Sequence, residues 1–225
     1  MHEPNLTQSI EDYLKIIYDL TTSDLRASTN QIAERLGVTP ASVSGMIKRL
    51  ASSEPPLLRY EKHHGVKLTE QGERAALEVI RHHRLLELFL HQTLGYTWDE
   101  VHSEADRLEH VISEKFEERM AHALGNPLQD PHGEPIPRSD LSIPKLSGVR
   151  LSDLRLGQRA VIQRVSNTEP QLLRYLSTIG LVPQAQILVV GYSSFDDNLR
   201  LQVKGKSEPL VLGPRVTQQI YVEVQ

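Results

Sequence analysis

Histidine and carboxylate side chains recur at helical spacing between residues 97 and 124, where the pattern of apolar residues predicts helix. Asp106, Glu109 and His110 stand at positions i, i+3 and i+4, so one helical face would present all three. His102 lies one turn earlier on the same stripe. Imidazole nitrogens and carboxylate oxygens bind divalent metal ions, and one helix can hold several of them in place. The spacing therefore predicts a metal site on this helix.

Two other segments offer ligands of the same kind. His83 and Glu87 form an i, i+4 pair on a preceding long helix, and Asp12 lies in the first predicted helix beside apolar residues. Taken singly, each group also fits a solvated helix face, or histidines without a ligand role. The metal interpretation depends on their combination, which also explains why residues 98–118 hold eight acidic side chains against two basic ones.

The ligand types restrict the metal. The chain has no cysteine, which excludes thiolate zinc fingers, iron–sulfur clusters and disulfides. Mixed nitrogen and oxygen donors favour manganese or ferrous iron over copper(I) or structural zinc. Since the general affinity order would favour zinc or nickel, selectivity must come from geometry and from metal availability.

A second group of residues points to DNA. Thr29–Leu36 places its apolar residues on one helical face, and Gly37 follows where a helix C-cap would adopt a positive φ. Pro40–Ser52 predicts a second helix with small polar residues near its start. Two short apolar runs within Leu57–Leu68 then predict a β-hairpin, or wing. Together these elements are typical of a winged helix-turn-helix.

The local charge supports contact with nucleic acid, although the whole chain carries a net charge of −4. Five basic residues meet two acidic ones between Pro40 and Leu68, and phosphate contacts require such a positive balance. The alternative is a three-helix packing unit that touches no DNA. The residues predicted to contact DNA are Ser28, Thr29, Asn30, Thr39, Ala41, Ser42, Ser44, Lys48 and His63.

Beyond residue 125 the character of the sequence changes. Prolines and glycines punctuate residues 125–148, which predicts a linker or irregular structure. After Arg150, short β-rich runs alternate with turn residues, which predicts a small barrel. The predicted strands are Ala160–Val165, Ile187–Tyr192, Arg200–Val203, Leu210–Leu212 and Ile220–Val224.

The sequence gives no sign of a membrane protein. No run approaches the roughly 20 apolar residues that cross a bilayer. Residues 1–6 lack the basic and apolar regions of a secretory signal. We therefore expect a cytoplasmic protein without a membrane partner.

With these residues in view, the chain resembles the diphtheria-toxin-repressor family of iron- and manganese-dependent transcriptional regulators. The similarity extends over residues 5–140 and is carried by the expected first helix, the helix-turn-helix, the metal-binding helices and the irregular segment that follows. The matching runs are Ser9–Tyr18, Ile32–Leu36, Val43–Ser44, His83–Glu87, Val101–His110, Asn126–Pro127, Ile136–Pro137 and Ser139.

The resemblance implies two metal positions. The primary position would be ligated by Asp12, Asp106, Glu109 and His110. The ancillary position would use His83, Glu87 and His102, with help from Glu169 and Gln171 of the C-terminal domain.

Two departures within this resemblance bear on the metal and on DNA. Iron-sensing members place methionine and cysteine where Asp12 and Asp106 stand, whereas manganese-sensing members carry carboxylates at both positions. The resemblance therefore implies Mn(II), with Fe(II) as the alternative. Lys15 stands where some manganese-sensing members have a further acidic ligand, which argues against a two-metal cluster. Gly45 replaces a longer polar side chain on the recognition helix of some relatives.

The resemblance also implies a fold and an assembly. The expected fold is a mainly α N-terminal winged helix-turn-helix plus a helical dimerisation and metal-binding domain, with a small all-β SH3-like barrel at the C-terminus. The expected limits are 1–74 for the DNA-binding domain, 75–140 for the helical domain, 141–150 for a linker and 151–225 for the SH3-like (FeoA-like) domain. A homodimer would bind double-stranded DNA at a palindromic operator.

The expected function is a repressor of metal-homeostasis genes, whose operator binding Mn(II) activates. Without metal, Asp12 and the carboxylates of the metal helix would repel one another, and the cation would tie them together. A metal-dependent hydrolase with Glu109 as general base is one alternative; the C-terminal barrel acting alone, in ferrous transport or protein interaction, is another. Because no nucleophile accompanies the ligands, we expect no catalytic residues and no enzymatic activity.

Overall fold

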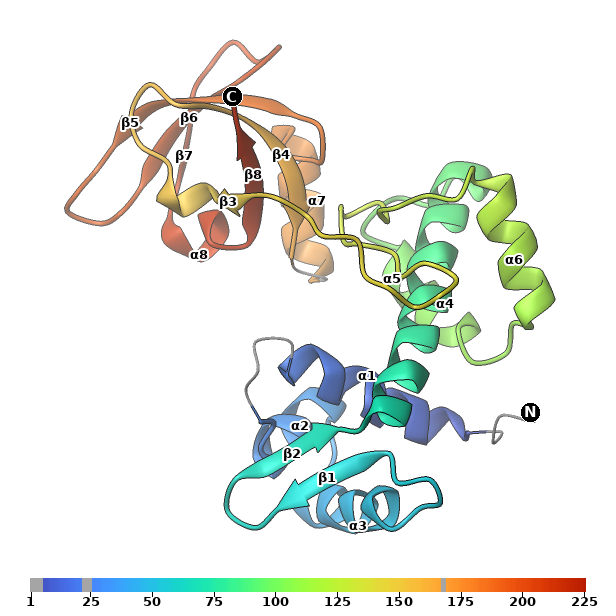
Figure 1. The fold of residues 1–225 in the computed structure, drawn as a ribbon. Helices are drawn as coiled ribbons and strands as arrows, with labels where there is room; N and C mark the ends of the chain where they lie inside the picture. Colours follow the sequence, from blue (N-terminus) through green and yellow to red (C-terminus); the bar gives the residue numbers. More distant parts are fainter. Residues whose placement is uncertain (1–5, 22–25, 167–168) are drawn as a thin grey trace. The chain divides into compact units, whose positions relative to one another are not determined.

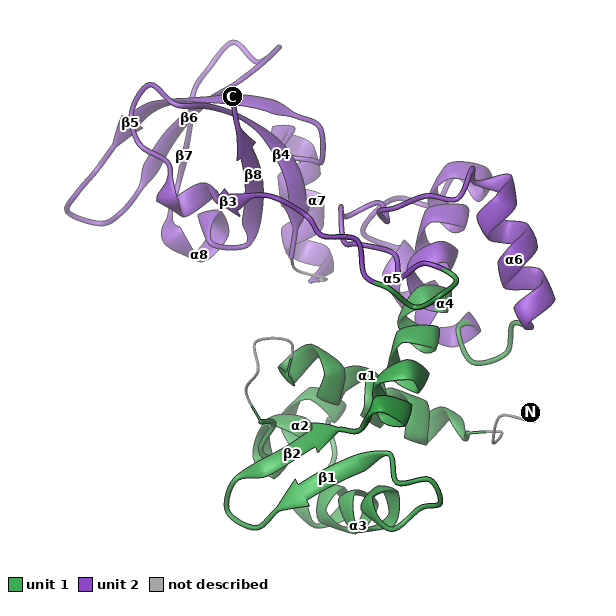
Figure 2. Ribbon diagram, in the orientation of Figure 1, with its two compact units in different colours: residues 1–82, 109–112, 139–142 green, residues 83–108, 113–138, 143–225 purple. Residues whose placement is uncertain are grey.

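The computed structural model describes residues 6–21, 26–166 and 169–225. Residues 1–5, which belong to the predicted DNA-binding domain and to the segment used to exclude a secretory signal, lie outside the described residues. The chain divides into two compact units (Figure 2). Unit 1 comprises residues 1–82, 109–112 and 139–142, and unit 2 comprises residues 83–108, 113–138 and 143–225.

Unit 1 is a winged helix-turn-helix (Figure 1). Its elements are α1 (Gln8–Thr21), α2 (Thr29–Leu36), α3 (Pro40–Ala51), β1 (Leu58–Glu61), β2 (Gly65–Leu68) and the first part of α4 (Glu70–Leu94). Ser28 caps α2 through a capping box with Gln31, and Gly37 ends it at φ 65°, in the left-handed region. Thr39 caps α3 by accepting from the Ser42 amide. The predicted helix-turn-helix and hairpin are confirmed.

The core of unit 1 forms because each helix buries one apolar stripe. The buried members of α1 recur at helical spacing and meet those of α2, α3 and the hairpin. They include Ile10, Leu14, Ile17, Ile32, Val43, Ile47, Leu50, Leu58 and Val66. This packing holds α1 in a fixed rotation about its axis and so decides which of its polar residues face outward.

The wing depends on one glycine. β1 and β2 pair antiparallel, with Leu58 opposite Leu68 and Glu61 opposite Gly65. Gly65 has φ 97°, and a Cβ there would lie 2.5 Å from the Ala27 carbonyl oxygen. Glycine is therefore required both for the backbone conformation and for the close approach to Ala27.

Unit 2 contains the rest of α4, two further helices and the β-rich domain. Its elements after α4 are α5 (Val101–Leu108), α6 (Glu114–Ala123), β3 (Val149–Arg150), η1 (Leu151–Asp153), β4 (Arg159–Val165), α7 (Pro170–Ile179), β5 (Gln186–Tyr192), β6 (Leu199–Val203), β7 (Leu210–Leu212), α8 (Pro214–Thr217) and β8 (Ile220–Val224).

The sheet of unit 2 has six antiparallel strands in the order β3-β8-β4-β5-β6-β7. The five predicted strands are confirmed, and the structure adds β3 and helix α7. The expected mixture of a mainly α N-terminal part and a small all-β C-terminal domain is also confirmed, but the sheet does not close into a barrel by strand pairing, since β3 and β7 are its edges. Register shifts in β4 and β5 allow the sheet to bend around its core.

Trp98 belongs to the core of this β-rich domain. It is 7% exposed and lies in one apolar cluster with Leu173, Leu176 and Ile162. Its indole Nε1–H donates a hydrogen bond to the Leu173 carbonyl oxygen at 3.1 Å. The segment that leads into α5 is thereby attached to α7.

The helix predicted over residues 97–124 is present as two helices with a turn between them. α5 ends at Leu108, and α6 begins after Ser113, whose side chain accepts a hydrogen bond from the Phe116 amide. The cap starts a new helix in a new direction, because it satisfies an amide that a continuing helix would bond to an earlier carbonyl. Glu109 and His110 consequently lie in a turn, while Asp106 remains on α5.

None of the described helices has the length and apolar character needed to cross a membrane.

Replacing Ile32 by alanine tests the core of unit 1. Ile32 is fully buried, so Ile32→Ala should lower the free energy of unfolding of this unit by about 2–5 kcal/mol. Native-state hydrogen exchange of the amides of α1, α2 and α3 reports that quantity for this unit. Glu34→Ala, on the exposed face of the same helix, is the matched control and should change it by no more than about 0.5 kcal/mol.

Candidate functional site

Three predicted ligands meet in unit 1 at a group of side chains that we name the α1 cluster: Asp12, Glu109 and His110. One potential ligand atom from each lies within 4.8 Å of the others. His110 Nε2 is 3.0 Å from Asp12 Oδ1 and 3.3 Å from Glu109 Oε1. The Glu109 and His110 side chains are buried, whereas the Asp12 side chain is 37% exposed.

The fold explains why these residues meet. α1 turns its apolar stripe of Ile10, Leu14 and Ile17 into the core, which leaves Asp12 on a different face. The end of α5 releases Glu109 and His110 into a turn that belongs to the same compact unit as α1. Two segments almost a hundred residues apart in sequence therefore share one site.

Glu11 orients the imidazole of His110. His110 Nδ1 and Glu11 Oε2 lie 2.5 Å apart, and because a carboxylate only accepts, Nδ1 carries the hydrogen. This contact leaves Nε2 facing Asp12 and Glu109, the arrangement by which outer carboxylates orient histidine ligands of metals. The sequence interpretation missed Glu11; its place beside Asp12 in a predicted helix was the available signal.

The carboxylates also set the charge of His110. Burial lowers the pKa of the imidazole, but Asp12, Glu11 and Glu109 outweigh burial and raise the pKa to about 9. At neutral pH the imidazole therefore holds a proton unless another cation takes its place.

The α1 cluster fits a divalent cation. His110 Nε2 is buried, and an oxygen of Asp12 and an oxygen of Glu109 lie within 3.3 Å of it. An imidazole nitrogen directed at two carboxylate oxygens is a donor set of the type that manganese and ferrous iron accept.

A second cluster, in unit 2, contains His83, His102 and Asp106. Asp106 Oδ1 is 3.4 Å from His83 Nδ1, and Asp106 Oδ2 is 3.5 Å from His102 Nε2. The resemblance assigned Asp106 to one site with Asp12, Glu109 and His110, but the structure places its carboxylate with the two histidines. Asp106 lies on α5, one helical turn after His102.

A third cluster lies beside the second, because its member Glu87 contacts His83 and His102. Glu87, Asp130 and His132 are all buried and offer ligand atoms within 4.8 Å of one another. Glu87 Oε1 lies 3.0 Å from His83 Nε2 and 3.1 Å from His102 Nδ1, while Glu87 Oε2 lies 3.7 Å from His132 Nδ1.

Histidines stabilise this buried carboxylate. Burial alone would raise the pKa of Glu87, but His83, His102 and His132 hold it well below its usual range. Burial lowers the pKa of His132, yet its contacts with Glu87 and Asp130 raise it to about 9. His132 Nε2 lies 2.7 Å from the Trp98 carbonyl oxygen and donates to it, so Nδ1 faces Glu87.

Asp130 and His132 were missed in the sequence. They lie in the segment that its prolines marked as irregular, where no periodicity indicates which side chains share a face. The available signal was the close pairing of an acid and a histidine around Pro131.

Two predicted ligands from the C-terminal domain stand elsewhere. Glu169 is the N-cap residue of α7, and Gln171 lies in its first turn; both are exposed. None of the three clusters found among the described residues includes either of them.

The predicted DNA contacts gather at three places in unit 1. Ser28, Thr29 and Asn30 lie at the start of α2; Thr39, Ala41, Ser42, Ser44 and Lys48 at the turn and along α3; and His63 in the wing. All are exposed except Thr29, which is half-buried.

Local hydrogen bonds order the start of α3. Thr39 Oγ1 lies 3.0 Å from the Ser42 hydroxyl, and the Ser44 hydroxyl donates to the Pro40 carbonyl oxygen. Gly45 adds open space, because a Cβ there would meet nothing within 4 Å. Short side chains of this kind let a helix backbone approach a major groove closely.

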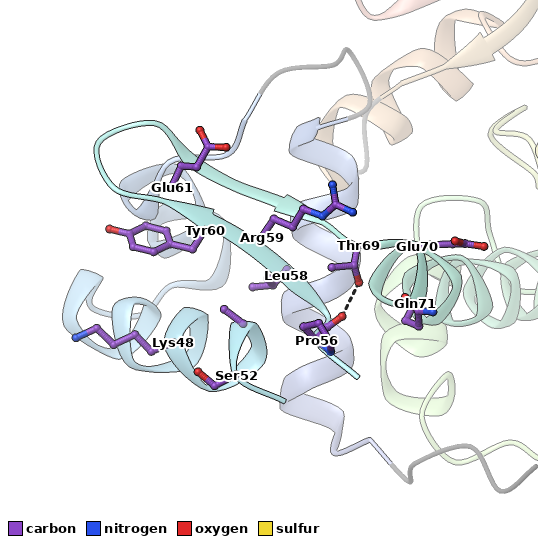
Figure 3. Close-up of a pocket in the computed structure, with 11 residues that line it drawn as sticks. Lys48, Ser52, Pro56, Leu58, Arg59, Tyr60, Glu61, Thr69, Glu70 and Gln71 are labelled. Carbon is purple, nitrogen blue, oxygen red and sulfur yellow. Dashed lines mark hydrogen bonds between the residues drawn. The ribbon is translucent and has the colours of Figure 1, made fainter. Parts of the chain in front are cut away.

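A pocket lies between α3 and β1 (Figure 3). Its lining includes Lys48 of α3, the C-cap residue Ser52, Arg59 and Tyr60 of β1, and Glu70 at the start of α4. Below it, Thr69 Oγ1 donates to the Pro56 carbonyl oxygen at 2.7 Å. Two basic side chains therefore line the pocket: Lys48, which is a predicted DNA contact, and Arg59.

Comparison with known proteins covers the chain in three parts. Residues 5–66 match the family model described as the N-terminal DNA binding domain of iron dependent repressors. Residues 69–138 match the metal binding and dimerisation domain of the same repressors, and residues 149–224 match the FeoA domain.

Individual proteins that resemble this chain are repressors of the same kind. The iron-dependent repressor IdeR of Mycobacterium tuberculosis is 37% identical over 196 residues, covering 82% of this chain and 84% of that protein. The diphtheria toxin repressor of Corynebacterium jeikeium is 34% identical over 170 residues, covering 74% of this chain and 70% of that protein.

Solved structures show the same similarity. A manganese-dependent transcriptional repressor in complex with manganese has a TM-score of 0.85 at 37% identity, covering 96% of this chain and 100% of that chain. The manganese regulator SloR has a TM-score of 0.77 at 34% identity, covering 98% of this chain and 100% of that chain. The family resemblance of the sequence is confirmed: the chain belongs to the iron-dependent repressor family, which includes the diphtheria toxin repressor.

Proposed function

We propose that this chain is a repressor of metal-homeostasis genes that binds DNA through unit 1 and binds it more tightly when Mn(II) is present. The proposal rests on the buried side chain of His110, whose Nε2 lies 3.0 Å from Asp12 Oδ1 and 3.3 Å from Glu109 Oε1, so that one nitrogen and two carboxylate oxygens stand close together. The site lies in the same compact unit as the helix-turn-helix.

Asp12, Glu109 and His110 would hold the ion. When bound, the cation supplies the positive charge that neutralises carboxylates from α1 and from the turn after α5. Asp12 joins the site from the helix that packs against α2 through Leu14 and Ile17, so a fixed Asp12 restrains the DNA-reading helices. Glu11 keeps the His110 ring oriented while its Nε2 changes partner.

We assign a second cation to the residues around Glu87 in unit 2. This carboxylate lies within 3.1 Å of nitrogens of His83 and His102, and Asp130 and His132 complete a buried cluster on its other side. Asp106, which contacts His83 and His102 here, remains a proposed ligand of the primary position with Asp12. Glu169 and Gln171 remain proposed ligands that the C-terminal domain would supply.

Manganese is proposed before iron because Asp12 and Asp106 stand where the resemblance gives iron-sensing members methionine and cysteine. Two carboxylates and one imidazole, without sulfur, suit a hard divalent ion. Manganese-dependent repressors are among the similar structures, and IdeR, an iron-dependent repressor, gives Fe(II) as the second candidate.

The proposal extends to the DNA and to the assembly. The match to a dimerisation domain supports a homodimer, and a two-fold dimer would bind a palindromic operator. We retain the limits 1–74, 75–140 and 151–225 for the three domains, with 141–150 as linker. A repressor of this kind works on the chromosome in the cytoplasm, and we assign it no catalysis.

Manganese should raise the affinity for operator DNA at least tenfold, about 1.4 kcal/mol. Fluorescence anisotropy with a selected operator fragment, at fixed salt and with manganese or a chelator, measures this change. His110→Ala should remove the response, because it deletes the nitrogen that faces both carboxylates. His122→Ala, an exposed histidine of α6, is the matched control and should respond like the wild type. Equal DNA affinity of the wild type with manganese and with chelator would contradict the proposal.

Manganese affinity should also depend on pH. Burial lowers the pKa of His110, but the neighbouring carboxylates raise it to about 9, so the imidazole must lose a proton to bind a cation at neutral pH. Affinity should therefore increase about tenfold per pH unit as the pH rises toward that value. Isothermal titration between pH 6.5 and 7.5 measures the change, and an affinity independent of pH would show that no proton is displaced.

Lys48 should contribute to DNA affinity through phosphate. Its side chain is exposed on α3, so Lys48→Ala should weaken binding to all sequences similarly and reduce the slope of log affinity against log salt by about 1. Lys145→Ala, at an exposed lysine of unit 2, is the control. An unchanged salt slope for Lys48→Ala would remove this residue from the interface.

A further inference from the structure

Lys15 holds the most buried carboxylate of the α1 cluster. Its ammonium nitrogen lies 2.9 Å from Glu109 Oε1 and 2.8 Å from Glu109 Oε2, so it contacts both oxygens. The Glu109 side chain is 1% exposed and that of Lys15 is 16% exposed. Little water reaches this ion pair, and the two charges therefore interact strongly.

One of these oxygens, Glu109 Oε1, is the one that a cation at His110 would use. Glu109 Oε1 lies 3.3 Å from His110 Nε2 and 2.9 Å from Lys15 Nζ. An ion bound between Asp12, Glu109 and His110 would therefore share a carboxylate with the ammonium group. Two positive charges at such a short separation repel each other, and the repulsion is weakly screened in a buried site.

We propose that Lys15 is an internal competitor of the metal ion at Glu109 and weakens the affinity of the α1 cluster for divalent cations. The inference rests on the proposed function, because it presumes that this cluster holds the ion. Without the ion, Lys15 keeps Glu109 neutralised and α1 attached to the turn at residues 109–110. Lys15 thus sets the concentration of free metal at which the ion replaces it at the Glu109 carboxylate.

The charges around the cluster give the sign of the effect. Glu11, Asp12 and Glu109 contribute three carboxylates, and Lys15 and His110 are cationic side chains that pair with them in the described part of the chain. Removing the lysine charge leaves the carboxylates with less compensation and makes a divalent ion more strongly attracted. It also leaves Glu109 buried beside fewer cations, which destabilises the protein until a metal binds.

The test is a manganese titration of the full chain by calorimetry against a competing chelator, with His110→Ala identifying the binding step that belongs to the α1 cluster. Lys15→Met keeps the length of the side chain without its charge and should bind manganese at least tenfold more tightly in that step. Lys15→Arg keeps the charge and should stay within about threefold of the wild type, well under the 1.4 kcal/mol of a tenfold change. Lys145→Met, at an exposed lysine of unit 2, controls for the loss of one positive charge.

Thermal unfolding gives a second readout. With chelator, Lys15→Met should melt below the wild type, and manganese should raise its melting temperature by more than it raises that of the wild type. If Lys15→Met does not fold, Lys15→Gln replaces it in both measurements, because glutamine is neutral but can still donate a hydrogen bond to Glu109.

The outcomes separate the two proposals. If the wild type shows the manganese-binding step that His110→Ala removes, but Lys15→Met and Lys15→Gln bind manganese in that step no more tightly than the wild type, only the competitor role is overturned. Absence of any manganese step that His110→Ala removes overturns the proposed function and the competitor role with it. Tighter binding by the neutral variants, with Lys15→Arg unchanged, supports both.

Discussion

Glu109 places a carboxylate in the interior of unit 1, and the surrounding residues are arranged to compensate its charge. A buried charge is tolerated only when opposite charges and hydrogen bonds replace the water it has lost. Lys15 contacts both of its oxygens, and His110 lies beside one of them. The expected repulsion among carboxylates without metal is therefore offset by two cationic side chains, and a metal ion would enter an existing balance of charge. Its binding strength is decided by the same contacts that hold α1 to the turn after α5.

In unit 2, imidazole groups compensate the charge of a buried carboxylate. Glu87 is buried, and histidines from α4, from α5 and from the irregular segment before residue 138 surround it. His132 also donates to the Trp98 carbonyl, and Trp98 enters the core of the β-rich domain through its contact with Leu173. A cation at Glu87 would thus act on residues that hydrogen bonds connect to the FeoA domain.

Local rules made most of the fold predictable. The helix-turn-helix follows from a capped helix, Gly37 at a left-handed C-cap and Pro40 at the start of the next helix, all within a few residues. The end of α5 was harder, because the apolar pattern continues through the turn and only Ser113 indicates a new helix. Local rules could not predict the partners of Lys15 and His132. The contact of Lys15 with Glu109 spans 94 residues and depends on the rotation of α1 about its axis. His132 lies in an irregular segment, where no periodicity indicates which side chains share a face. Ligand types could thus be predicted, but not their division among the clusters.

Anomalous diffraction at the manganese absorption edge, from crystals of the full chain grown with manganese, would locate the ion. We expect an anomalous peak within coordination distance of His110 Nε2 and of carboxylate oxygens of Asp12 and Glu109. Crystals of His110→Ala grown in the same way should lack that peak while keeping any peak near Glu87. Manganese bound only at other positions in the wild type, with Asp12 and Glu109 still paired to protein cations, would contradict the claim that the α1 cluster is the metal site.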